Sequence, residues 1–486
     1  MSADDRLERL TAGQEKVAQP IDLYEAMARA LKYNLDHKVE AMETVLRSRE
    51  LSDARFDLLP DVVARAGYAG RDNFSGASSS RILSDRAIGE QSLVASTSSE
   101  RFVVSSDLRV SWDVLDFGLS YVRAKQQADE VLIAEERRRA VANRIIEDVR
   151  TAYWRAVTAE RLIDRLRSLD TDVDSALSSS AALYERGRAS PISALTYRRE
   201  LLSIKQEIQS LQEDLAVARQ QLAALMNLKP GDPFKLVLPA RDKFLVDFTM
   251  PADAMVRKAL AYRPEIREIS YQQRINEKEA TAALLNLLPS LRAFGGFNYD
   301  SNEFLFNNHW AGWGAEASKN LVEAFRYPSR RKVIKAQGAL LDQRSLALTM
   351  AVVTQVHVSR TRFELAKRRL ETMRDFHQTQ ATITEQINAG VKARRVSRQT
   401  GIREQMNNIV AEARYDIALS NLHNSFANLH AAMGLDPLKE DVAADLSVEE
   451  LSGQLREIWR ERGDIVIAEA DPVAKKIAQV SHSQKK

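Results

Sequence analysis

Residues 58–68, LLPDVVARAGY, and residues 287–297, LLPSLRAFGGF, contain the pattern that decides the fold of this chain. Each stretch interrupts a long polar segment with Leu-Leu-Pro and then alternates small, apolar and aromatic residues. The second stretch begins 229 positions after the first, and at this offset eleven of the 44 residues in 30–73 are identical to those in 259–302. The similarity predicts an internal tandem repeat. Because proline disfavours helix in the residue before it, each Leu-Leu-Pro is expected to end a helix.

Each repeat predicts the same four elements in the same order: a helix, a β-hairpin, a long helix and a return helix. In the first repeat, residues 1–228, they are expected over 22–57, 61–114, 119–184 and 191–227. In the second repeat, residues 251–435, they are expected over 251–287, 290–320, 329–387 and 394–434. A linker (229–250) joins the repeats, and residues 436–486 hold a short amphipathic helix near 447–462 and a polar tail.

The hairpins are predicted from strict alternation of apolar residues over about ten positions, which is typical of a half-buried strand. One face of the first hairpin carries Val62, Ala64, Ala66 and Tyr68, and the second hairpin repeats the pattern from Leu291 to Tyr299. The copies differ mainly in the Ser-rich stretch 73–100, which has only a short counterpart in the second repeat. An insertion tolerated at one point indicates a surface loop.

The long helices carry apolar and alanine residues at a 4-3 spacing, which is typical of a coiled-coil seam. In the first repeat this seam contains Ile145, Val149, Ala152, Ala156, Ala159, Ile163, Leu166, Val173 and Leu177. About 65 residues at 1.5 Å each give a rod of roughly 100 Å. Gly187 and Gly390 follow the long helices, and we expect a positive φ at each glycine where the chain reverses.

The composition excludes several classes of protein. Seventy Lys and Arg against 67 Asp and Glu give a net charge of +3, without the clustered basic patch typical of nucleic-acid binding. The chain has no cysteine, and its mean hydropathy is -0.34 with no long apolar run. The first residues, MSADDRLERLTAGQEK, lack the apolar core of a secretory signal, so an exported form is expected to be a processed chain with an added start Met.

No catalytic constellation is evident in the sequence. The seven histidines have no metal-binding spacing, and no glycine-rich phosphate loop is present. We therefore expect a protein that is not an enzyme and that uses no cofactor or metal.

Periodicity alone leaves two architectures open. Four strands per chain cannot close a barrel, and an open sheet edge in lipid is forbidden, so lipid-facing strands would force oligomerisation. Strands in water would instead form a small sheet that caps a soluble periplasmic coiled-coil scaffold.

The order of these elements resembles that of the TolC-like outer-membrane efflux and secretion channel family, or outer membrane factors. The resemblance covers residues 20–437 and includes WDVLDFG at 112–118, YERG at 184–187 and ALAYRP at 259–264. It implies an α+β membrane channel: a homotrimer in the outer membrane of a Gram-negative bacterium, with four strands per protomer in a shared twelve-stranded β-barrel. Its long helices would form a periplasmic helical barrel.

The resemblance also implies the partners and the function. The helical tip would meet a periplasmic membrane fusion (adaptor) protein that is fed by an inner-membrane pump of the RND or ABC type. The trimer would be a passive conduit for drugs, small toxic molecules or a secreted protein, and drug efflux and type I secretion are not distinguished.

This resemblance assigns expected positions to four sets of residues. The turns that contact the adaptor at the tip would contain Tyr184, Gly187, Ile387 and Gly390. The helix-to-strand junctions would be Pro60 and Pro289. The membrane-interface aromatics would be Tyr68, Trp112, Phe297, Tyr299, Trp310 and Trp313. The candidate pore-constriction charges are Lys392, Arg394, Arg395 and Arg398.

Two features depart from the family pattern. SKNLVEAFR at 318–326 replaces the WDVLDFG signature in the second repeat, so its junction differs from the first. The second tip is basic, where members of the family often carry Asp. Its charges would form either a positive ring in the pore or a solvated run that contacts partner hairpins.

Overall fold

The computed structural model describes residues 5, 9, 12–84, 86–185, 191–229, 231–241, 248–435 and 446–463. The chain divides into two compact units. One contains residues 1–44, 134–268 and 345–486, and the other contains residues 45–133 and 269–344. The sheet and residues 114–133 and 321–344, which begin the two long helices, belong to the second unit. The rest of the helical hairpins and the C-terminal helix belong to the first.

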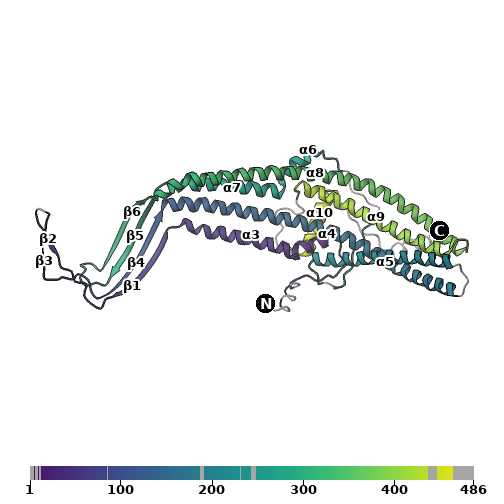
Figure 1. Cartoon of the computed structure of the whole chain (residues 1–486), viewed down its shortest axis with the longest axis horizontal. Coiled ribbons are helices and arrows are strands. Elements are labelled where there is room, and N and C mark those ends of the chain that lie inside the picture. Colours follow the sequence, from purple (N-terminus) through teal and green to yellow (C-terminus); the bar gives the residue numbers. More distant parts are fainter. Residues whose placement is uncertain are drawn as a thin grey trace, which may run out of the picture. The chain divides into compact units, whose positions relative to one another are not determined.

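The sheet has four antiparallel strands in the order β1-β4-β5-β6 (Figure 1). Their bounds are Asp61–Gly70, Phe102–Asp113, Ser290–Asp300 and His309–Ser318. The sequence-predicted hairpins 61–114 and 290–320 therefore contain the expected strands, although Val114 already belongs to a helix. Between β1 and β4, residues Ser80–Ile82 (β2) and Ile88–Gln91 (β3) form a further two-stranded hairpin within the stretch expected to be a loop.

The helical hairpins match each other in length. The long helices α4 (Val114–Glu185) and α8 (Leu321–Lys392) have 72 residues each. The return helices α5 (Pro191–Leu225) and α9 (Arg398–Ala432) have 35 residues each. Both long helices start earlier than the predicted 119 and 329. Helix α8 runs through Pro328, its eighth residue, where the proline removes one i→i−4 hydrogen bond from the helix.

The prediction of one unbroken helix before each hairpin was wrong. The first is divided into α2 (Leu23–Tyr33) and α3 (Leu35–Ala54), and the second into α6 (Ala252–Tyr262) and α7 (Pro264–Leu285). Asn34 is extended at ψ 132°, and its side-chain oxygen accepts the N–H of Asp36 at 2.9 Å, so it ends one helix and caps the next. Arg263 precedes Pro264 and is forced out of the helical region.

The seam predicted on α4 is largely buried. Seven of its nine residues are at most 8% exposed: Ile145, Val149, Ala152, Ala156, Ala159, Leu166 and Val173. The part of the seam from Ile145 to Ala156 packs with α2, the end of α5 and the C-terminal helix α10 (Val448–Glu461). The part of the seam from Ala159 to Val173 packs with α5 and with Ile402, Met406 and Ile409 of α9. A third apolar cluster joins α6, α8 and α9.

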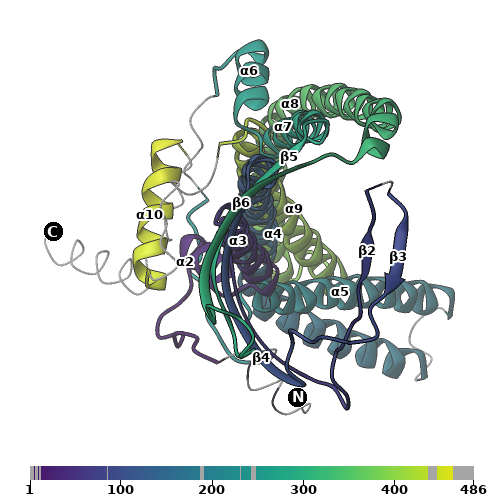
Figure 2. The same cartoon turned by 90° about the vertical axis from the view of Figure 1, so that its left-hand side faces the viewer.

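The C-terminal helix α10 lies against α2 (Figure 2), which places it near the first part of the linker. A full capping box starts α10 at Ser447 and Glu450. In the linker, Leu236 forms an isolated parallel bridge with Ile21, and residues 242–247 lie outside the described part. No helix among the described residues is both long and apolar enough to cross a membrane.

Candidate functional site

The four-stranded sheet has two chemically different faces. Directly paired residues point to the same side, so the register assigns every strand residue to one face. Apart from Ser106 and His309, one face carries only apolar, aromatic and glycine side chains. Its larger members are Val62, Tyr68, Phe102, Val104, Leu108, Val110, Trp112, Leu291, Phe297, Tyr299 and Trp313. All of these lie exposed on the single chain.

The opposite face is polar and charged. Its charged members are Asp61, Arg65, Asp107, Arg109, Asp113, Arg292, Asp300 and Glu316. The guanidinium of Arg109 lies 5.8 Å from the ring centroid of Phe294, which is on the same face. Strands of ten to twelve residues with one apolar and one polar face have the length and pattern of transmembrane β-strands.

The six sequence-predicted aromatics do not all share one face. Trp310 pairs with Asn298 and so belongs to the polar face, whereas Trp313 pairs with Gly295 on the apolar face. The other four, Tyr68, Trp112, Phe297 and Tyr299, are on the apolar face with Trp313. Sequence reasoning missed Phe102, whose ring stacks on that of Tyr68 at 6.3 Å, although extending the alternation along β4 would have found it.

The Leu-Leu-Pro junctions lie at the same end of the sheet. Pro60 and Pro289 immediately precede β1 and β5, and both of these strands run antiparallel to β4. Ser111 faces both Asp61 and Phe294, so β5 starts four residues before the level at which β1 starts. A stagger of this kind accompanies strands that are tilted.

Each strand-to-helix junction is fixed by a different set of polar groups. After β4, the carboxylate of Asp113 accepts the backbone N–H of Leu115 at 2.9 Å and the hydroxyl of Ser290. After β6, Lys319 donates to the carbonyls of Asn286, Leu287 and Leu288. The residues that replace the WDVLDFG signature therefore bind the second Leu-Leu-Pro turn directly.

The predicted tip residues that the structure describes, Tyr184, Ile387 and Gly390, lie near the ends of the long helices. Tyr184 lies in the last turn of α4; its side chain and Gly187 are outside the described part. Ile387 and Gly390 both lie within α8. The positive φ expected at Gly390 was wrong, since Arg394 has φ 56° instead. Gly390 is needed for space: a Cβ there would lie 2.6 Å from Cγ2 of Val396.

A network of charges around two buried carboxylates, Glu412 and Asp416, ties three segments of the helical unit together. Arg241 of the linker donates to Asp416 at 2.7 Å and to Glu412 at 2.9 Å, both on α9. Arg161 on α4 donates to Asp416 at 3.0 Å, and Arg165 pairs with Glu412. Burial opposes the charge of Arg241, but the two carboxylates outweigh it and raise its pKa. Sequence reasoning missed this network because its partners lie far apart in the chain.

The seam between α8 and α9 changes from apolar to polar toward the tip. Phe363 and Leu370 are buried in apolar packing, whereas Gln380 donates to Glu404 at 2.9 Å and Thr384 donates to the carbonyl of Glu404 at 3.1 Å. Between these regions, the ring of His377 stacks on Tyr415 at 5.6 Å. The helical hairpin α8–α9 is therefore held by hydrogen bonds near its turn and by apolar packing around Phe363 and Leu370.

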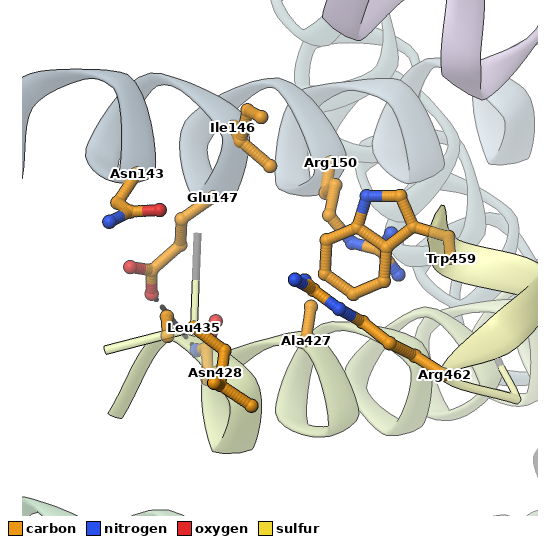
Figure 3. Close-up of a pocket in the computed structure, with 10 residues that line it drawn as sticks. Asn143, Ile146, Glu147, Arg150, Ala427, Asn428, Leu435, Trp459 and Arg462 are labelled. Carbon is orange, nitrogen blue, oxygen red and sulfur yellow. Dashed lines mark hydrogen bonds between the residues drawn. The ribbon is translucent and has the colours of Figure 1, made fainter. Parts of the chain in front are cut away.

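A small pocket between α4, α9 and α10 surrounds a buried arginine (Figure 3). The guanidinium of Arg150 lies 4.5 Å from the ring centroid of Trp459 and donates to the carbonyl of His423 at 3.2 Å. Asn428 donates to Glu147 at 2.9 Å across the same opening. These contacts hold α10 on the helical hairpins, and they include no nucleophile. The described residues hold no cluster of three potential metal ligands.

Two solved outer-membrane channels and one solved outer-membrane protein have the same fold. The CmeC channel of Campylobacter jejuni matches with a TM-score of 0.66 at 14% identity, over 92% of this chain and 95% of CmeC. The open state of the Neisseria gonorrhoeae MtrE channel gives 0.63 at 16% identity, over 85% of this chain and 89% of MtrE. VceC of Vibrio cholerae gives 0.62 at 12% identity, over 85% of this chain and 96% of VceC.

No protein-family model and no curated protein sequence matches this chain. At these sequence identities the structural likeness establishes the fold. The chain therefore has the fold of TolC-like outer-membrane channels, and the resemblance predicted from its sequence is confirmed at that level.

Proposed function

We propose that this chain is a trimeric outer-membrane channel-tunnel, which passes exported substrates from an inner-membrane pump and a periplasmic adaptor across the periplasm and the outer membrane. The observation that carries the proposal is the two-faced sheet. Its apolar face would meet lipid and its charged face would line an aqueous pore.

The exposure of the apolar face supports contact with lipid. On the single chain Phe297 and Tyr68 are both 70% exposed, and Trp313 is 89% exposed. Soluble proteins rarely leave a continuous apolar surface of this kind in water. The alternative, a soluble periplasmic coiled-coil scaffold with a small β-sheet cap, would leave this face uncovered.

The sheet edges support a closed trimer. Within the described sheet, β1 and β6 are edge strands, each with one unpaired row of backbone N–H and C=O groups. Lipid cannot satisfy these groups, so β6 of one protomer would pair with β1 of the next. Three protomers would close a barrel of twelve strands.

The exposed apolar faces of two helices also support assembly. Helix α3 has no buried residue, and Val39 and Met42 are 64% and 66% exposed. Helix α8 leaves Phe325, Leu346 and Met350 exposed at 63% or more. Neighbouring protomers would cover these faces, because long helices without a globular core bury apolar surface only by packing side by side.

In this proposal the chain is a tandem repeat, because each β-hairpin is followed by a long helix and a return helix of the same two lengths. The protein would lie in the outer membrane of a Gram-negative bacterium and extend into the periplasm. It would be a passive conduit, not an enzyme, and it would open at the tip near Ile387 and Gly390. The pump, of the RND or ABC type, would supply the energy and select the cargo.

Inter-subunit disulfides test the assembly, because the chain has no native cysteine. Ala64 of β1 and Ala311 or Ala315 of β6 are on the same face but on strands at opposite edges of the sheet. Ala64→Cys combined with Ala311→Cys or Ala315→Cys should therefore give covalent dimers and trimers on oxidation at one of these registers. Ala64→Cys alone is the control. If both double-cysteine variants stayed monomeric on oxidation, the proposal would be contradicted.

A further inference from the structure

The turn between α8 and α9 is closed by short-range contacts. The backbone N–H groups of Arg395 and Val396 both donate to the carbonyl of Gly390, at 2.8 Å and 3.2 Å. Ser397 then caps α9, its hydroxyl accepting the N–H of Thr400 at 3.1 Å. The turn is thus a defined structure, and the side chains between Lys392 and Val396 are presented by a fixed backbone.

The basic residues of this tip fall into two groups. Arg398 pairs with Asp172 of α4 at 3.7 Å, and Arg403 pairs with Glu200 of α5 at 3.0 Å. These two charges are therefore paired with carboxylates inside the helical unit. Lys392, Arg394 and Arg395 are exposed, and no carboxylate of the described chain pairs with them. We call these three residues the basic turn.

Arg394 occupies a position that does not favour arginine. Its φ of 56° lies in the left-handed region, which glycine and asparagine adopt most readily. A strained backbone that keeps a long charged side chain at an exposed turn points to a function for that side chain. The strain and the unpaired charges are independent observations at the same place.

The shape of the basic turn favours a macromolecule over a small ligand. Small-molecule sites are concave, whereas these side chains project from the end of a helical hairpin. We propose that the basic turn docks onto an acidic protein surface, one that presents Asp or Glu side chains to Lys392, Arg394 and Arg395. This inference rests on the proposed function and specifies the chemistry of the adaptor that meets the tip.

Binding of two synthetic helical hairpins to the detergent-purified full chain tests this inference. The hairpins are identical except that three turn positions are Glu in one and Lys in the other. The Glu hairpin should bind more tightly, and its affinity should fall as ionic strength rises from about 0.05 M to about 0.5 M. Arg394→Glu combined with Arg395→Glu should weaken this binding at least about tenfold and shift the preference to the Lys hairpin.

Arg71→Glu combined with Arg81→Glu is the matched control. Both arginines are exposed, both belong to the unit that contains the sheet, and the change in net charge is the same. This control variant should bind the Glu hairpin as the unchanged chain does.

Several outcomes would overturn the inference. They are equal binding of the two hairpins, equal loss in both double variants, or no binding of either hairpin. An altered ion selectivity in the Arg394→Glu/Arg395→Glu variant without hairpin binding would also overturn it, because the charges would then act on permeating ions. Bilayer conductance of the same preparation separates the two claims. If the protein conducts but binds neither hairpin, only this inference is contradicted. If the preparation never conducts, the proposed function itself is contradicted.

Discussion

Gly390 and Val396 meet where α8 turns back into α9, and the contact leaves no room for a Cβ. Gly390→Ala would place that atom 2.6 Å from Cγ2 of Val396. Overpacking of this kind costs about 1–3 kcal/mol, so we expect faster hydrogen exchange over residues 385–400. The double variant Gly390→Ala/Val396→Ala should recover most of the protection. Equal exchange in the single and double variants would show that crowding is not the cause.

We expect the stability of the helical hairpin α8–α9 to depend on pH through His377. Burial lowers its pKa below the ordinary 6.5; nearby Glu412 and Asp416 oppose the shift, whereas Arg241 and Arg165 add to it. The folded chain therefore keeps His377 neutral after the unfolded chain has bound a proton. Stability is lost as pH falls below about 6.5 toward the lowered folded value.

The loss of stability should be visible in the free energy of unfolding at about pH 7.5 and about pH 5.5. His377→Gln should remove part of the difference between these two values, because glutamine does not titrate. Identical pH dependence in the two proteins would rule out His377 as the source.

At the scale of elements, the two faces of β6 give a matched comparison. Trp313→Arg puts a charge on the apolar face, and Trp310→Arg makes the same change on the polar face of the same strand. A charge facing lipid costs about 2–4 kcal/mol near the bilayer midplane, whereas a charge facing an aqueous lumen is tolerated. Trp313→Arg should therefore reduce the folded fraction in lipid vesicles, measured by heat-modified gel mobility, far more than Trp310→Arg. Equal losses would contradict this assignment of the faces.

The buried charge network should stabilise the union of the linker with α9. Arg241→Met leaves Asp416 and Glu412 with fewer partners and should cost about 3 kcal/mol in the free energy of unfolding. Arg165→Met is the control, since Arg165 also pairs with Glu412 but its side chain is 45% exposed. The control should cost less than about 1 kcal/mol. Chemical denaturation of both variants measures the difference, and equal costs would show that burial does not set the strength of this network.

The strands and the long helices could be predicted because each has a strong local signal. Alternation defines β1, β4, β5 and β6, and Leu-Leu-Pro places the ends of the preceding helices. The same alternation would have separated Trp310 from Trp313, which are three residues apart and so cannot share a face of a strand. The break before Pro264 was also visible in the sequence, because proline restricts the residue before it.

Other features depend on contacts that no local pattern encodes. The pairs Arg241–Asp416 and Arg150–Trp459 join residues far apart in the chain, and only the tertiary fold brings them together. Gly390 was predicted for its φ, but its role is to admit Val396, a neighbour that periodicity does not identify. Similarly, Lys319 follows β6 in the chain but donates to the carbonyls of the Leu-Leu-Pro turn that precedes β5.

At the scale of the whole molecule, the proposed trimer unites features that a single chain leaves incomplete. The apolar face of the sheet, the edges of β1 and β6, and the exposed faces of α3 and α8 each need a covering surface. Lipid and two further copies of the chain would supply all of these surfaces at once. The assembled protein would therefore enclose a water-filled path.

Single-channel recording detects a water-filled path as steps of ionic current. Detergent-purified protein, shown by light scattering to have the mass of a trimer, is added to a planar lipid bilayer. The trimer should give discrete current steps of uniform size, and a monomeric fraction should give none. A trimer-sized preparation that never conducts, or a protein that stays monomeric without detergent, would contradict the proposed trimeric channel.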